Sequence, residues 1–105
     1  MKNTLENGQI RVIIFQEGNI WYGVALEFNI VESGDDPREV MLMLDEAIRG
    51  YVEATKKEKL SISVLNQETN SEYEKLWENA QAKKADTPSN VYISGLFPFS
   101  SLAAV

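Results

Sequence analysis

The sequence contains no cysteine and no histidine among its 105 residues. Without cysteine there is no disulfide framework, no thiolate zinc site and no cysteine nucleophile. Without histidine the chain lacks the commonest general base, the commonest metal ligand and the side chain that titrates near neutral pH. We therefore expect no cofactor, and a protein that acts by binding rather than by catalysis.

Long apolar stretches are also absent, and no run approaches the ~20 residues that a membrane-spanning helix needs. The first nine residues, MKNTLENGQ, lack the apolar segment of a signal peptide. The length suits one domain covering residues 1–105. These features predict a single cytoplasmic domain with no membrane partner.

Basic residues are few: 10 lysines and arginines face 16 acidic residues, for a net charge of −6. Nucleic-acid binding normally depends on a basic patch that neutralises phosphates. We therefore expect no direct nucleic-acid partner. The charge favours a basic protein as the partner, because complementary charge speeds encounter.

Residues 32–57, ESGDDPREVMLMLDEAIRGYVEATKK, are predicted to contain the main helix. Asp36 is a suitable N-cap, Pro37 suits the first helical position, and Glu39 completes a capping-box spacing. A helical period also gathers an apolar stripe that must be buried against neighbouring structure. The stripe contains Val40, Leu44, Ala47, Tyr51 and Thr55, flanked by Met43, Ile48 and Ala54.

Two stretches before this helix, residues 9–16 and 20–28, have the β-branched content and alternation of strands. Gly18 and Asn19 between them are typical of a hairpin turn. Residues 30–33 are predicted to form a short third strand or to continue the second after a bend.

After the main helix, residues 60–65 alternate and are interpreted as extended. Ser71 and Glu74 form a second capping box, which predicts a short helix to about Lys84. Residues 91–95 are predicted to be a strand, and 96–105 form an apolar tail. The element order predicts an α+β fold, with an antiparallel sheet and the main helix packed on one face.

The stretch VALEFNIVESGDDPREVMLMLDEAIRGYVEA resembles the N-terminal domain of the HicB-like antitoxin family. Residues 33–36, Ser-Gly-Asp-Asp, correspond to the family's turn, and Glu39-Val40 to its helix start. Residues 44–48 and 51–53 correspond to the helix body. The resemblance covers about residues 10–56, and it leaves residues 60–105 as an extension.

The resemblance implies a β-β-β-α-β core related to a degenerate, non-catalytic ribonuclease-H-like fold, here with a short second helix. It also implies that the chain binds and blocks a small basic mRNA-cleaving toxin of the HicA type. Many family members continue into a DNA-binding domain. The acidic stretch after Lys59 contains one short helix instead, so we expect no operator binding by this chain.

If the main helix covers one sheet face, the alternation places Trp21 and Glu27 on the other face with Ile13 and Phe15. That apolar face is either covered by the second helix and the tail, used for self-association, or used as a docking surface. In the docking interpretation Trp21 is an aromatic anchor. Self-association would use Ile13 and Phe15 together with Phe97 and Phe99 of the tail, which alternatively closes the sheet edge, swaps into a neighbour or binds a partner.

Acidic residues cluster near the start of the main helix, and these include Glu32, Asp35 and Asp36. One interpretation is that they cap the helix and complement its dipole. The other is that they mimic phosphates and occupy the RNA-binding surface of a toxin. Leu42 lies on the polar side of the helix, where a contact role and plain exposure are both open.

A metal-dependent nuclease is the enzyme alternative, because ribonuclease-H-like folds hold two divalent ions between clustered carboxylates. Here the acids lie around a turn and a helix cap. Glu27 is the only acid within a predicted strand, and it has no evident partner. The sequence therefore predicts no catalytic and no metal site. The prediction is an antitoxin-type binding protein that self-associates; the alternative is an oligomeric scaffold without a toxin partner.

Overall fold

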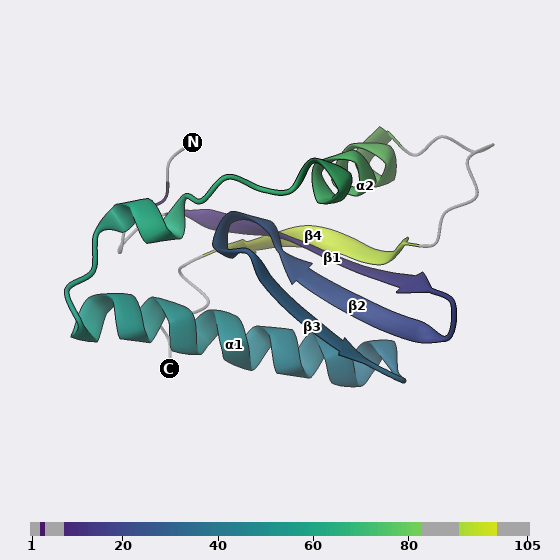
Figure 1. Ribbon diagram of the computed structural model, residues 1–105, viewed down its shortest axis with the longest axis horizontal. Helices are drawn as coiled ribbons and strands as arrows, with labels where there is room; N and C mark the ends of the chain where they lie inside the picture. The colour runs from purple at the N-terminus through teal and green to yellow at the C-terminus, as the bar shows by residue number, and fades with distance from the viewer. Residues whose placement is uncertain (1–2, 4–7, 83–90, 99–105) are drawn as a thin grey trace.

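The computed structural model describes residues 3, 8–82 and 91–98, with the backbone alone at residues 62, 82, 91–94 and 97–98. A four-stranded antiparallel sheet has one helix on each face, so the α+β class and its main helix are confirmed (Figure 1). The elements are β1 (Gln9–Glu17), β2 (Ile20–Ala25), β3 (Ile30–Gly34), α1 (Pro37–Lys57), α2 (Ser71–Ala82) and β4 (Val91–Pro98), with 3-10 turns η1 (Leu26–Phe28) and η2 (Ile62–Leu65). None of the described helices is long and apolar enough to cross a bilayer.

The strand order is β3-β2-β1-β4, so β3 and β4 are the two edges of the sheet. The hairpin between β1 and β2 turns at Gly18, whose φ of 63° is easily adopted by glycine. The second strand is shorter than expected, because the chain leaves the sheet after Ala25 and forms η1. Asn29, at φ 54°, reverses the chain into β3, a separate third strand.

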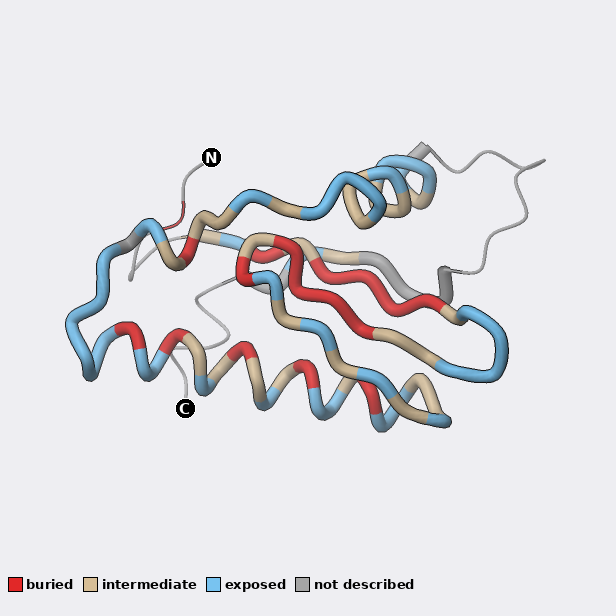
Figure 2. Tube along the Cα trace, in the orientation of Figure 1, coloured by how far each residue is buried: buried red, intermediate tan, exposed pale blue. Residues whose placement is uncertain are grey.

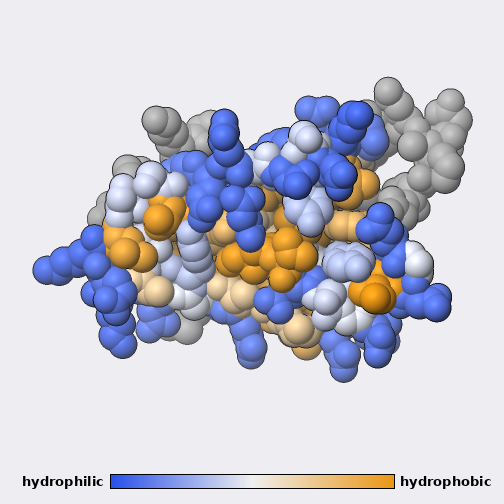
Figure 3. Space-filling model, in the orientation of Figure 1, coloured by the Kyte–Doolittle hydropathy of each residue, from blue (hydrophilic) through white to orange (hydrophobic). Residues whose placement is uncertain are grey.

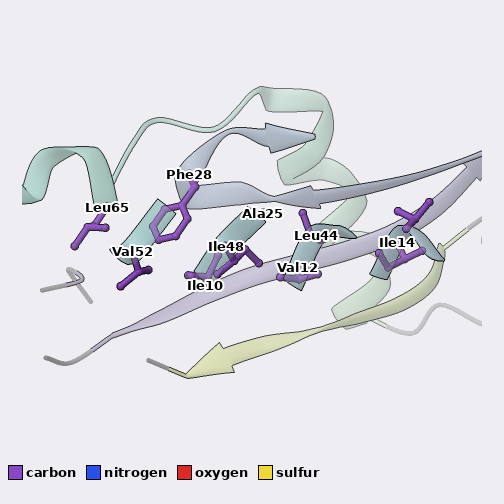
Figure 4. Close-up of a cluster of buried hydrophobic side chains, with 10 residues drawn as sticks. Ile10, Val12, Ile14, Ala25, Phe28, Leu44, Ile48, Val52 and Leu65 are labelled. Atoms are coloured by element: carbon purple, nitrogen blue, oxygen red, sulfur yellow. The ribbon is translucent and has the colours of Figure 1, made fainter. Parts of the chain in front are cut away.

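Helix α1 begins at the predicted residues, but the reciprocal capping-box bond from Glu39 is not formed among the described residues. The Asp36 side chain accepts a hydrogen bond from Arg38 N at 2.7 Å, and Pro37 occupies the first helical position. The buried stripe is shifted from the expected one, because Ile48 and Val52 are buried where Ala47 and Tyr51 were expected (Figure 2). Figure 4 shows these side chains meeting those of β1 and η1 in the larger core. The larger core contains Ile10, Val12, Ile14, Ala25, Phe28, Val40, Leu44, Ile48, Val52 and Leu65.

Helix α2 covers the opposite face of the sheet, where it lies along β4 and β1 (Figure 1). Tyr73, Leu76 and Trp77 pack there against a smaller core. That core contains Ile13, Phe15, Val24 and Leu26. The second apolar face is therefore covered by the second helix within one chain, which was one of the three alternatives that the sequence left open.

The predicted sharing of one face by Trp21 and Ile13 is wrong. In the register of β1 with β2, Gln16 pairs with Trp21 and Ile13 pairs with Val24. Trp21 consequently packs against the α1 core, whereas Ile13 faces α2. The error arises because alternation gives the two faces of each strand but not the register between strands.

The segment after α1 also differs from its prediction. Residues expected to be extended form the 3-10 turn η2, which inserts the fully buried Leu65 beneath α1. Asn70 rather than Ser71 caps α2, since its Oδ1 accepts from Glu72 N at 2.8 Å. The last strand extends to Pro98, beyond the predicted residue 95.

Candidate binding surface

Strand β3 is an edge strand with little protection on its outer side. It pairs with β2 from Ile30 to Gly34, and no other described strand pairs with it. Its backbone amides and carbonyls that point away from β2 are therefore open to another strand. Val31 lies on this edge with 44% of its surface exposed.

Four carboxylates border this edge, and we call Glu32, Asp35, Asp36 and Glu39 the acidic rim. Only Asp36 is engaged within the described residues, as the helix cap and in a 3.7 Å contact with the exposed Arg38. The carboxylates of Glu32, Asp35 and Glu39 make no hydrogen bond or ion pair with any described residue. Three free carboxylates thus keep the local potential negative, beyond what the helix N-terminus requires.

Trp21 and Leu42 flank the acidic rim on different elements. Trp21 is half-buried and pairs with Gly34 at the end of β3, directly before Asp35. Leu42 is 67% exposed on α1 and lies three residues after Glu39, hence on the same helix face. Figure 3 shows apolar residues as separate islands between hydrophilic side chains on this side of the molecule. The surface is therefore mixed, with polar groups around small apolar contacts.

Glu27 lies elsewhere, and its expected lack of a partner is wrong. Its carboxylate accepts from the Arg11 backbone N at 2.8 Å and from Arg11 Nε at 2.5 Å. The same guanidinium donates to both oxygens of Glu74 on α2, at 2.7 and 2.6 Å, and lies 5.8 Å from the Trp77 ring centre. Glu27 therefore ties η1 to β1 and helps to dock α2, rather than facing a partner.

The Arg11 guanidinium also changes the acidity of Glu74. Its hydrogen bonds to the carboxylate hold the pKa of Glu74 below its ordinary value of 4.5. The two carboxylates in turn raise the pKa of Arg11. Through this network, Arg11 on β1 connects η1 and α2 by ion pairs.

The residues expected to mediate self-association have separate positions. Ile13 and Phe15 are buried under α2, so neither side chain reaches the surface in this conformation. Phe97 belongs to β4 and pairs through its backbone with Ile10. Phe99 lies outside the described residues.

A polar hollow of about 330 Å³ opens at the start of β1, between Arg11, Glu27 and Leu96. Asn3 and Gln9 complete its lining, and Asn3 Oδ1 accepts from Gln9 N at 2.8 Å. The charged groups in the hollow are already paired with each other. Across the residues that the structure describes, no three acidic side chains gather into a metal-binding group.

Sequence reasoning missed the open edge itself, together with Val31 and Leu96. Alternation shows that a stretch is a strand, but it does not reveal which strands end the sheet. For β4, the sequence feature that could have indicated an open edge is the lack of any charged residue in positions 91–98.

No protein-family model, no curated protein and no solved structure matches this chain.

Proposed function

We propose that this chain is a HicB-like antitoxin-type protein that sequesters a small basic mRNA interferase of the HicA type. The observation that carries the proposal is the open β3 edge bordered by the acidic rim. An unpaired strand edge offers backbone hydrogen bonds, and free carboxylates select for a basic partner. An mRNA-cleaving partner would place the chain in the cytoplasm.

In this mechanism the negative rim first steers the toxin to the β3 edge. An extended toxin segment then adds to the sheet beside β3, where backbone bonds give affinity and adjacent side chains give specificity. Trp21, Val31 and Leu42 supply apolar contact next to the charges. Occupying the toxin's RNA-binding surface with carboxylates blocks its access to mRNA, so inhibition is stoichiometric.

The strand and helix order supports the family assignment within this proposal. Three antiparallel strands lead into α1 and a fourth strand completes the sheet, as the HicB-like core requires. Helix α2, inserted between α1 and β4, is a departure from the β-β-β-α-β core. It covers the second face, which leaves the two edges of the sheet, and of these the β3 edge carries the acidic rim that suits a basic toxin.

Titration calorimetry with a small basic HicA-type protein, sought first among the products of neighbouring genes, tests the proposal. We expect the wild-type chain to bind in a 1:1 ratio of subunits, with micromolar affinity or tighter. The double variant Glu32→Lys/Asp35→Lys should weaken binding by about tenfold or more, because rim charges now repel a basic partner. It should also fail to protect cells that express the toxin.

The matched control is the double variant Glu53→Lys/Glu58→Lys, the same two charge reversals at exposed positions near the other end of α1. Binding should be nearly unchanged in this variant. No heat of association with the wild-type chain at micromolar concentration, or equal weakening by the rim and control variants, would contradict the proposal.

The second candidate function is an oligomeric scaffold of the same fold without a toxin partner. The uncharged second edge of the sheet, β4, is the observation that favours it. Self-association and toxin binding are compatible because the two edges lie on opposite sides of the sheet.

A further inference from the structure

Strand β4 is the second open edge of the sheet, and its chemistry differs from that of β3. It pairs with β1 from Gln9↔Pro98 to Phe15↔Val91, and no described strand lies on its outer side. Its sequence, VYISGLFP, contains no charged residue, and none occurs anywhere after Asp86. Proteins usually protect long edge strands with charges, prolines or bulges. In β4 such features occur only at the two ends, as a register shift opposite Ile14 and Phe15 and as Pro98, so residues 93–97 form a regular and neutral edge.

Leu96 and Gly95 mark the same edge. Leu96 is 51% exposed, although it is a large aliphatic residue in a strand. Gly95 weakens a strand interior, yet a Cβ built there meets nothing within 4 Å. No close contact recorded inside the chain requires glycine at this position. A strand added at the edge approaches in the plane of the sheet, whereas a Cβ points out of that plane, so Gly95 permits pairing there without being required for it.

The distribution of charge indicates that a second copy of this chain can pair with β4. The chain carries a net charge of −6, so two copies repel each other over most of their surfaces. Pairing β3 with its own copy would bring Glu32 of each chain together at the centre of the strand, which is unfavourable. The β4 edge is uncharged along its whole length, so two copies meet there without opposing charges.

We propose that two copies of this chain pair through the outer edges of β4, antiparallel about a two-fold axis, forming one continuous eight-stranded sheet. Facing residues in a sheet must point to the same side, so the axis passes at a residue position rather than between two residues. We place it at Ser94 or Gly95, the two small residues in the middle of β4. Both α1 helices then lie on one face of the joint sheet and both α2 helices on the other. The two β3 edges stay free at its ends.

Concentration-dependent mass measurement by sedimentation equilibrium tests this dimer. We expect the wild-type chain to be mostly dimeric at about 100 µM and to dissociate on dilution. Leu96→Glu, which places two carboxylates in the interface, should raise the dimer dissociation constant by about tenfold or more. The matched control is Val31→Glu, an exposed aliphatic residue on the opposite edge, which should leave dimerisation unchanged.

A cysteine-based test does not depend on how well Leu96→Glu folds. The chain has no native cysteine, so a single introduced one reports a single position. We expect Ser94→Cys or Gly95→Cys to form a disulfide-linked dimer under mild oxidation, because residues on the axis approach within disulfide distance. Ser33→Cys on β3 should remain monomeric on a non-reducing gel.

A wild-type chain that stays monomeric at concentrations up to about 1 mM would overturn the proposal. Equal weakening by Leu96→Glu and Val31→Glu, or crosslinking through Ser33→Cys but through neither β4 cysteine, would also overturn it. These outcomes are independent of toxin binding, because each measurement is made on the chain alone.

Discussion

At the residue scale, Gly23 determines how closely α1 approaches the sheet. A Cβ built at Gly23 would lie 2.7 Å from Val40 Cγ1 and 2.9 Å from Ile14 Cδ1. Both neighbours are fully buried, so neither moves without disturbing the core. The sequence placed Gly23 within a strand, but only the register showed that it faces the helix.

Replacing Gly23 with alanine should therefore destabilise the fold by about 1–3 kcal/mol, as overpacking of a dense core usually does. Urea unfolding followed by tryptophan fluorescence measures the change. The control is Gly50→Ala in mid-helix, where a Cβ meets nothing within 4 Å. It should stabilise the chain by up to about 1 kcal/mol, and a destabilised Gly50→Ala together with an unaffected Gly23→Ala would contradict this packing account.

At the element scale, the start of α1 could be predicted from sequence because the residues that determine it are neighbours in the chain. Asp36 and Pro37 act within one turn, and the structure confirms both. The position of α2 was not readable, because it depends on contacts between residues 63 positions apart, such as Arg11 with Glu74. Three of the four rim carboxylates belonged to the acidic cluster recognised from sequence, without Glu39. The pairing of Glu27 with Arg11 was missed, because Arg11 lies 16 residues earlier on β1.

The link between Arg11 and Glu74 should make the docking of α2 dependent on pH. The folded state lowers the pKa of Glu74 from 4.5, so the unfolded chain takes up this proton first as the pH falls. The stabilisation is fully present above about pH 4.5 and is lost as the pH falls through the lower folded value. Glu74→Gln should thus be less stable than wild type at about pH 7, with a difference that shrinks in acid.

Urea titrations of both proteins across that pH range measure the difference. Glu78→Gln, an exposed position on the same helix, is the control and should follow the wild-type profile. A Glu74→Gln deficit that is the same at every pH would show that the carboxylate charge does not hold α2.

At the scale of the whole molecule, the sheet has two edges of opposite character. The β3 edge is bordered by free carboxylates, while the β4 edge carries no charge. Helices on both faces leave these edges as the places where the sheet can be extended. A basic partner at one edge and a second copy at the other form a consistent assembly, with a toxin at each end of a joint sheet.

The mass of the native protein by light scattering, alone and with the small basic protein encoded beside its gene, tests the central claim most directly. We expect a stable complex containing equal numbers of both chains, built on the dimer. A homo-oligomer whose mass does not change when the basic protein is added would contradict the antitoxin role, and it would favour the scaffold.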